Sequence, residues 1–169
     1  MKTICYLTDK NVLDIDSTPS QKPPRLTSRA IVKHEDGKHA VIYFAKFGFY
    51  SLPGGGIEND ETPSDAVKRE VLEETGCHAK DISELGIISE NRGRLDYTQI
   101  SYFYIVTVGE IGELHLTQAE IDEGTEVQWH SFDKMKYLIA SKIHETDQRR
   151  FIQARDLAAI EEYGNNMRV

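Results

Sequence analysis

The sequence predicts a single α/β domain over residues 1–169. Segments rich in β-branched and aromatic residues, which are typical of strands, alternate with segments whose apolar residues recur at helical spacing. The length of 169 residues fits one domain with one sizeable core. Hydrophobic residues make up 39% and charged residues 28% of the chain, so the composition indicates a folded globular protein and excludes a disordered one.

The first part of the chain predicts three short strands. The first covers residues 1–9 and is followed at 10–25 by a loop that has turn-forming residues and no periodicity. Strands at 30–33 and 39–47 come next, joined through an Asp-Gly dipeptide suited to a tight hairpin turn.

A glycine-rich loop at 51–56 leads into a helix whose ends are both marked by the sequence. Thr62 suits the N-cap, Pro63 the first helical position, and Gly76 the position just after the last turn. The sequence therefore predicts a helix from Pro63 to Thr75.

The rest of the chain predicts three strands, an acidic loop and two closing helices. Residues 102–108 are β-branched and aromatic, which favours a central position in the sheet. In chain order, the expected segments are strands at 82–91 and 94–108, a loop at 109–126, a strand at 127–132, and helices at 133–140 and 145–163.

Three carboxylates share one face of the 63–75 helix. Glu70, Glu73 and Glu74 are three and four residues apart, a spacing that brings their side chains together one turn apart. Carboxylates this close repel one another unless cations hold them, and oxygen-rich clusters suit Mg²⁺ or Mn²⁺. Arg69 lies beside them and can pair with a carboxylate. The alternative interpretation is a solvated acidic helix face.

The same segment resembles the Nudix box at each of its fixed positions. Two departures are mild: Asp60 stands where the family often has glycine, and Cys77 stands where an aliphatic residue is usual. The matching run is Gly55-x5-Glu61-x7-Arg69-Glu70-Val71-x-Glu73-Glu74-x-Gly76-Cys77.

The resemblance implies a fold and a set of roles. It implies a Nudix fold, an α/β/α sandwich with a mixed β-sheet. It also implies that Glu70, Glu73 and Glu74 bind Mg²⁺ or Mn²⁺, that Glu73 and Glu74 act in catalysis, and that Arg69 orients the carboxylates. Gly55 is expected to support the site where substrate approaches the loop.

Later residues are expected to complete the site. The family often adds an acidic residue from a loop ahead of a Trp-containing strand, and here Glu123 precedes Trp129 by six residues. We favour Glu123 as a further ligand or base, with Glu126 next; a solvated acidic loop is the alternative. Arg29 and Arg92 are candidates for contacting substrate phosphates, or are simply surface charges.

The resemblance implies hydrolysis of the diphosphate linkage of a nucleoside diphosphate derivative by metal-assisted attack of water. A nucleoside triphosphate or a nucleotide sugar is the expected substrate. ADP-ribose is disfavoured, because the proline that marks that subgroup is absent about 15 residues after the box. The alternative is a catalytically inactive Nudix-fold regulator that binds a nucleotide.

Charge and hydropathy argue against several other classes of protein. The net charge of −8 argues against binding to nucleic acid, which needs a basic surface. No apolar run is long enough to span a membrane, and the N-terminus lacks the apolar core of a signal peptide. We therefore expect a cytoplasmic enzyme that acts on a small molecule without a membrane partner, with a homodimer left open.

Overall fold

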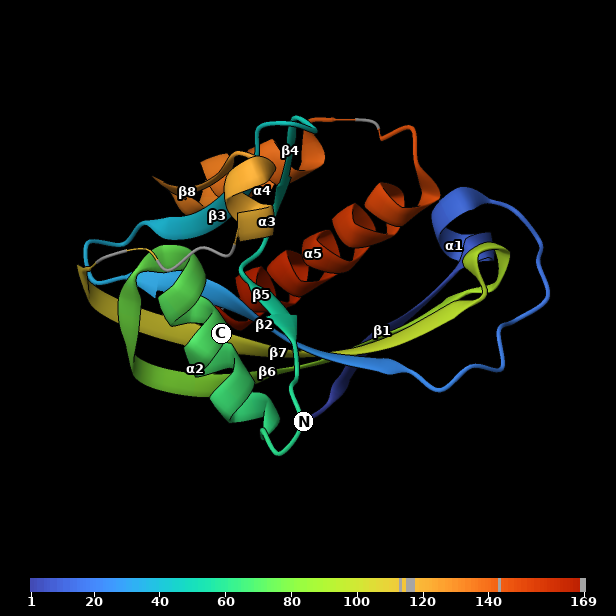
Figure 1. Ribbon diagram of the computed structural model, residues 1–169, viewed down its shortest axis with the longest axis horizontal. Helices are drawn as coiled ribbons and strands as arrows, with labels where there is room; N and C mark the ends of the chain where they lie inside the picture. The colour runs from blue at the N-terminus through green and yellow to red at the C-terminus, as the bar shows by residue number, and fades with distance from the viewer. Residues whose placement is uncertain (113, 115–117, 143, 168–169) are drawn as a thin grey trace.

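The computed structural model describes residues 1–112, 114, 118–142 and 144–167. Figure 1 shows the course of the chain. The elements in order are β1 (Thr3–Thr8), α1 (Asp9–Leu13), β2 (Arg25–His34), β3 (His39–Phe44), β4 (Phe49–Ser51), β5 (Gly54–Gly56), α2 (Pro63–Thr75), β6 (Cys77–Arg92), a 3₁₀ turn (Gly93–Leu95), β7 (Tyr97–Ile111), α3 (Gln118–Asp122), β8 (Thr125–His130), α4 (Phe132–Ala140) and α5 (Asp147–Asn166).

The described strands form one mixed sheet, as expected. Its path runs β1-β6-β7-β2-β3-β4, with β5 paired to β2 and β8 paired to β3. The pairs β1–β6 and β2–β7 are parallel, whereas β6–β7 and β2–β5 are antiparallel. The only register pair between β2 and β3 joins Lys33 to His39. Strands β3, β4 and β8 therefore form an antiparallel extension of the sheet.

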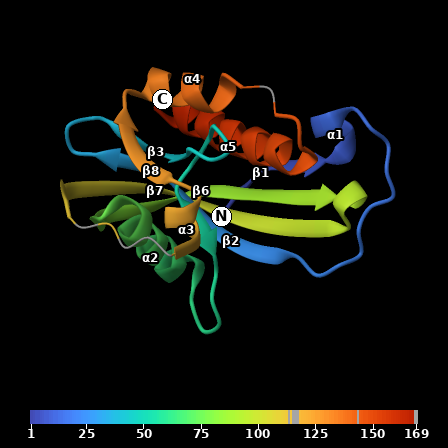
Figure 2. The same ribbon diagram turned by 45° about the horizontal axis from the view of Figure 1, so that its top comes forward.

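Both faces of the sheet are covered, because side chains alternate along its central strands. In β2, Ala30 and Val32 pack into the core beneath α2, whereas the intervening Ile31 packs into the core shared with α4 and α5. Figure 2 shows α4 and α5 above the sheet and α2 below it. The expected α/β/α sandwich is confirmed.

The 63–75 helix has the predicted bounds. Thr62 accepts a hydrogen bond from the Asp65 amide, Pro63 occupies the first turn, and Gly76 ends the helix in the left-handed region with φ 70°. Val67 and Val71 are fully buried beneath the sheet. Local capping and an apolar stripe thus fix which face of α2 points outward.

The strand expected at 82–91 begins earlier, at Cys77, and the strand expected at 94–108 begins later, at Tyr97, after a 3₁₀ turn. Four other segments differ in kind or extent from the sequence expectations. The expected loop at 10–25 overlaps helix α1, which begins at a capping box between Thr8 and Asn11. The expected 39–47 strand ends at Phe44, and a separate strand, β4, follows the turn. The glycine-rich loop contains β5, and the expected 109–126 loop begins as strand and contains α3. Residues 113 and 115–117 of that loop lie outside the described part.

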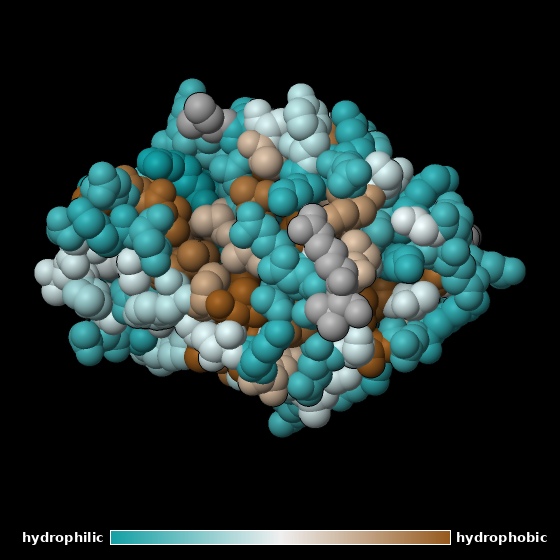
Figure 3. All heavy atoms as spheres, turned by 180° about the vertical axis from the view of Figure 1, so that it is seen from behind, coloured by the Kyte–Doolittle hydropathy of each residue, from teal (hydrophilic) through white to brown (hydrophobic). Residues whose placement is uncertain are grey.

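The outer surface is mixed in character. Figure 3 shows hydrophilic side chains around the outline of the rear face, with hydrophobic ones in groups between them. Among the described helices, none is both long and apolar enough to cross a membrane.

Candidate active site

Arg69 gathers carboxylates from the loop and from α2. Its Nε donates to Glu61 Oε1 at 2.8 Å and its Nη2 to Glu61 Oε2 at 3.1 Å, a two-point contact. Its Nη1 donates to Glu70 Oε1 at 2.8 Å and to Glu73 Oε2 at 3.1 Å. Nη2 also donates to the Gly56 carbonyl at 2.9 Å. One guanidinium therefore draws three carboxylates together and ties α2 to the glycine strand β5.

Glu70 fits against Gly55 because that residue has no side chain. A Cβ atom at Gly55 would lie 2.4 Å from Glu70 Oε1 and 2.6 Å from the carboxyl carbon, closer than non-bonded atoms approach. The Glu70 side chain is only 12% exposed. The glycine thus gives Glu70 its position, and the expected role of Gly55 near the site has a steric basis.

Glu74 supports the loop from the buried side of α2. Its Oε2 accepts a hydrogen bond from the Gly54 amide at 2.7 Å, and the residue is 7% exposed. Glu74 therefore holds β5 against the helix, whereas Glu73 is on the more open side, with a side chain 37% exposed.

The pKa values in this cluster follow burial and the Arg69 contacts. Burial raises the pKa of the Glu70 carboxyl, although Arg69 opposes the shift. Hydrogen bonding to Glu61 raises the pKa of Arg69, and the same contact lowers the pKa of Glu61. Arg69 is therefore a permanent positive charge among the carboxylates at neutral pH.

The donor chemistry at this position suits a divalent cation. Arg69 binds Oε1 of Glu70 and Oε2 of Glu73, so each carboxylate keeps a second oxygen that Arg69 does not bind. Hard oxygen donors with a few carboxylates are the ligands of Mg²⁺ and Mn²⁺. In the described part of the chain, no three His, Cys, Asp or Glu side chains are already arranged around a metal position. The carboxylates fit the cation in kind, and Arg69 offsets part of the negative charge that a bound cation would neutralise.

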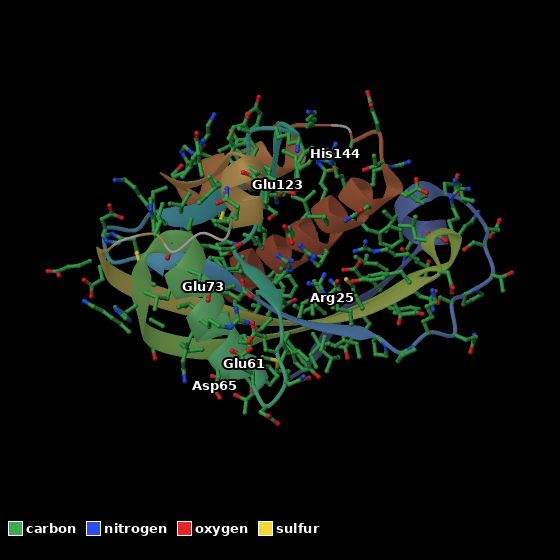
Figure 4. All side chains as sticks on the ribbon, viewed as in Figure 1. Arg25, Glu61, Asp65, Glu73, Glu123 and His144 are labelled. Atoms are coloured by element: carbon green, nitrogen blue, oxygen red, sulfur yellow. The ribbon has the colours of Figure 1, made fainter. Side chains whose placement is uncertain are left out.

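Glu123 does not join this cluster in the structure. Figure 4 shows it near the end of α3, across from Glu73 and Glu61 at α2. It lines a cavity of about 390 Å³ with Phe44, Phe47 and Phe49. The second acidic candidate, Glu126, is exposed on β8. No hydrogen bond among the described residues links either side chain to α2, so both remain predictions.

Arg29 and Arg92 lie together in a different cavity, between α5 and the sheet. Its volume is about 320 Å³, and it is lined by Arg25, Arg29, Arg92, Leu95, Tyr97, Gln99, Gln148, Ile152 and Arg155. Burial lowers the pKa of Arg29 to about 10, with the charge of Arg155 adding to the shift. Arg29 remains protonated at neutral pH, so the cavity stays cationic.

Sequence reasoning missed Arg25 and Arg155 in this cavity. Arg25 begins β2, and Arg155 is a buried residue of α5 with 1% exposure. An arginine inside an otherwise apolar helix stripe was the available signal for Arg155, because such a residue is almost never buried without a partner. Arg25 carried no local signal.

A family comparison identifies this arrangement of loop, helix and sheet. The family model for the NUDIX domain matches residues 24–154. The chain belongs to the NUDIX family. The matched range runs from β2 into the first turns of α5, so it includes the carboxylate cluster and the residues that line the arginine-lined cavity except Arg155.

Two relatives of this NUDIX domain have different names. A human protein named diphosphoinositol polyphosphate phosphohydrolase 3-beta is 31% identical over 117 residues, covering 69% of this chain and 66% of that protein. A MutT-like protein of Streptomyces ambofaciens is 44% identical over 64 residues, covering 38% of this chain and 41% of that protein. The chain thus spans less than two thirds of the length of these relatives.

Solved structures agree on the fold. A NUDIX hydrolase from Nitrosomonas europaea has a TM-score of 0.65 at 23% identity, covering 85% of this chain and 90% of that one. A MutT NUDIX hydrolase from Burkholderia pseudomallei has a TM-score of 0.57 at 20% identity, covering 83% and 98%. These likenesses establish the Nudix fold of this chain.

Proposed function

We propose that this domain is a hydrolase that cleaves the diphosphate linkage of a nucleoside diphosphate derivative with the help of Mg²⁺ or Mn²⁺. The arrangement around Arg69 carries the proposal: one guanidinium contacts Glu61, Glu70 and Glu73 at once. A solvated acidic face needs no such gathering, whereas a site for cations and phosphates does. Glu70, Glu73 and Glu74 would hold the cation.

The reaction is displacement at phosphorus by water. A bound cation would neutralise charge on the phosphate oxygens. Arg69 keeps the carboxylates in place, and a carboxylate takes the proton of the attacking water. The new bond joins the water oxygen to phosphorus, the bridging P–O bond breaks, and the bridging oxygen leaves on the second phosphate. Glu73 and Glu123 are the proposed bases.

A nucleoside triphosphate or a nucleotide sugar is the proposed substrate. The products would be a nucleoside monophosphate with either pyrophosphate or a phosphorylated group. The named activity of the human relative makes a diphosphoinositol polyphosphate the second candidate. The cationic cavity beside β5 favours anionic substrates of either kind.

Metal dependence and the glutamate roles are tested together. We expect hydrolysis to stop with a chelator and return with Mg²⁺ or Mn²⁺. Glu73→Gln should lower turnover by ~10²–10⁴-fold, the scale of losing a general base or a main charge stabiliser. The matched control is Glu161→Gln, which removes one exposed carboxylate from α5. Phosphate release over a panel of nucleotides is the measurement, and full activity in excess chelator contradicts the proposal.

The competing function is a regulator that binds a nucleotide without cleaving it. That protein would bind nucleotides equally well before and after Glu73→Gln and release no phosphate in either form. Phosphate release by the wild type that is lost in the variant excludes the regulator.

Glu123 is proposed to complete the site when substrate binds. It follows the short helix α3 and belongs to an acidic segment of the kind that often carries function. We expect Glu123→Gln to lower turnover by at least tenfold, on the scale of general-base loss, while binding of inorganic triphosphate is kept. If Glu123→Gln and the control Glu161→Gln both match the wild-type rate, the α2 glutamates supply the base.

A further inference from the structure

A second cationic pocket lies outside the proposed active site. In Figure 4, His144 is on the same side of the view as Glu123, opposite Glu73 and Glu61. The pocket around His144 shares no lining residue with the arginine-lined cavity and contains none of the α2 carboxylates. It is therefore separate from both groups of side chains that the proposed function uses. Its volume is about 240 Å³, and it is lined by Lys46, Phe47, Lys142, His144, Glu145 and Arg149.

Positive charge exceeds negative charge in this pocket. Lys46 and Arg149 make no ion pair among the described residues. The Lys142 ammonium donates to two backbone carbonyls of the turn between β3 and β4, at 3.2 Å and 3.0 Å, and likewise pairs with no carboxylate in the described structure. Glu145 is the one acidic residue that lines the pocket, and it is exposed. Three cations thus face one exposed carboxylate, although the whole chain has a net charge of −8.

His144 is buried next to these cations without a polar partner. It is 6% exposed, and its ring meets that of Phe49 edge-on, with centroids 5.7 Å apart. Within the described part of the chain, its ring nitrogens make no hydrogen bond. Burial lowers the pKa of His144, and the charges of Lys142 and Arg149 add to the shift. An anion in the pocket would offset those charges and would accept a hydrogen bond from the imidazole.

The three cations come from different segments and are brought together around one turn. Arg149, in the first turn of α5, has its Cζ 4.5 Å from the centre of the Phe47 ring and 5.6 Å from that of Phe49. The Lys46 ammonium lies 5.7 Å from the same Phe47 ring centre. Lys142 holds the carbonyls of the turn from the segment between α4 and α5. Cations that are already gathered lose less entropy when they bind an anion.

The turn that carries Lys46 is also joined to Glu123. The Lys46 amide donates to the Glu123 carbonyl at 3.1 Å. Phe47 and Arg149 line both this pocket and the aromatic cavity that contains Glu123. A ligand that steadies the turn would therefore also steady the backbone of Glu123.

We propose that this pocket is an accessory phosphate site, which binds a free phosphate or the phosphoryl group of a small molecule and steadies the turn that supports Glu123. Lys46, Lys142 and Arg149 supply the charge, and a phosphate dianion matches three cations better than a single carboxylate does. The anion site does not depend on the proposed function. Only the consequence for Glu123 as a base rests on that function.

Titration with inorganic phosphate tests the site through the ring signals of His144. NMR spectra are recorded in metal-free buffer, and chloride keeps the ionic strength constant, because added salt would otherwise screen the charges. The His144 signals are assigned by their loss in His144→Gln. We expect them to shift in a saturable way as phosphate is added. The ring signals of His78, an exposed histidine, should not shift.

Lys46→Glu should weaken phosphate binding on the order of tenfold, because it replaces an exposed attraction with a repulsion of similar size. Lys46 is exposed, so the substitution should leave the fold intact. Lys38→Glu is the matched control: it changes the net charge equally, at an exposed lysine in the turn between β2 and β3. The site is rejected if phosphate causes no saturable change at His144, or if Lys46→Glu and Lys38→Glu bind phosphate equally.

Hydrogen exchange at the Lys46 amide tests the link to Glu123, because this amide donates to the Glu123 carbonyl. Saturating phosphate should slow the exchange in the wild type and in Lys38→Glu. The same phosphate concentration should slow the exchange of the residue 46 amide much less in Lys46→Glu. Phosphate binding with unchanged exchange in the wild type would contradict the link to Glu123.

Competition separates the two sources of the phosphate. The adjoining cavity is lined by Phe44, Phe47 and Phe49, so a ring attached to the phosphate would have apolar surface to contact. A phosphorylated molecule predicts that phenyl phosphate displaces inorganic phosphate at lower concentration than phosphate itself requires, whereas a free phosphate predicts no such advantage. Phosphate binding by a protein that hydrolyses no nucleotide would reject the proposed function alone, and hydrolysis without phosphate binding at His144 would reject the accessory site alone.

Discussion

At the scale of single residues, Arg69 and Gly55 determine the positions of the carboxylates at α2. Arg69 supplies the positive charge that lets Glu61, Glu70 and Glu73 approach one another. Gly55 supplies the space that Glu70 occupies. One effect is electrostatic and the other steric, so the two can be separated by substitution.

Gly55→Ala should displace Glu70 without disturbing the fold. The added methyl would overlap the Glu70 carboxylate, and Gly55 does not have a positive φ, so the backbone itself tolerates alanine. A shift of about 1 Å at a reacting site can lower the rate on the order of 10²-fold, and we expect a loss of that size in turnover.

Gly109→Ala is the matched control for this substitution. It also adds a methyl within a strand, but the atoms it meets belong to the flexible end of Lys80. Turnover and thermal unfolding are measured for both variants. A Gly55→Ala enzyme with the turnover of Gly109→Ala would show that the position of Glu70 does not matter for the reaction.

The sequence predicted the carboxylate cluster better than the arginine-lined cavity. Arg69, Glu70 and Glu73 lie within one helical turn and a half, so spacing alone placed them on one face, and the structure brings them together. Arg25 and Arg155 come from opposite ends of the chain and meet only through the packing of α5 on the sheet. No local pattern encodes that contact.

At the scale of elements, a helix or strand could be predicted from the sequence when the residues that stabilise it lie close together in the chain. Helix α2 has the predicted bounds because each end is fixed by a residue next to it in the sequence. The Thr62 side chain caps the N-terminus, and Gly76 ends the C-terminus. Strand β5 consists of glycines, which have low strand propensity, and it exists through its pairing with β2. Helix α1 has five residues, too few to show a periodicity, and its capping box is its only signal.

The α2 cap is a direct test of this local encoding. Thr62 Oγ1 accepts the Asp65 amide at 3.1 Å and also donates to Asp65 Oδ2 at 2.6 Å. Thr62→Ala should lower the free energy of unfolding by about 1 kcal/mol, the usual cost of losing an N-cap. Thr62→Ser keeps the hydroxyl and should lose much less. Urea denaturation at unchanged slope is the measurement, and equal midpoints for the alanine and serine variants would show that the cap contributes nothing.

At the scale of the whole molecule, each of the two hydrophobic cores supports a different group of side chains. The core beneath α2 contains Val67 and Val71 and supports the carboxylate cluster. The core beneath α4 and α5 contains Ile31 and Phe103 and supports the helix that carries Arg155. The sandwich was predicted from the family resemblance, whereas the antiparallel extension β3–β4–β8 was not. Its short strands are defined by their mutual pairing and by the packing of α4.

His39 marks the junction between this extension and α5. The residue is 3% exposed, and its Nε2 lies 3.2 Å from the Tyr163 hydroxyl. Its ring contacts Phe132 and Tyr163, with centroids 5.6 Å apart in each case. Burial lowers the pKa of His39 to about 4, and the charge of Lys33 adds to the shift. The imidazole is therefore neutral in the folded protein at physiological pH.

This depressed pKa predicts a loss of stability in mild acid. The unfolded chain takes up a proton at His39 below its ordinary pKa of 6.5, whereas the folded chain does so only near 4, so folding is progressively disfavoured between these values. From about pH 7.5 to about pH 5 the wild type should lose about 2 kcal/mol more unfolding free energy than His39→Gln. His78→Gln, at an exposed histidine, is the control and should keep the wild-type slope. Parallel stability curves for the wild type and His39→Gln would show that His39 does not couple folding to protons.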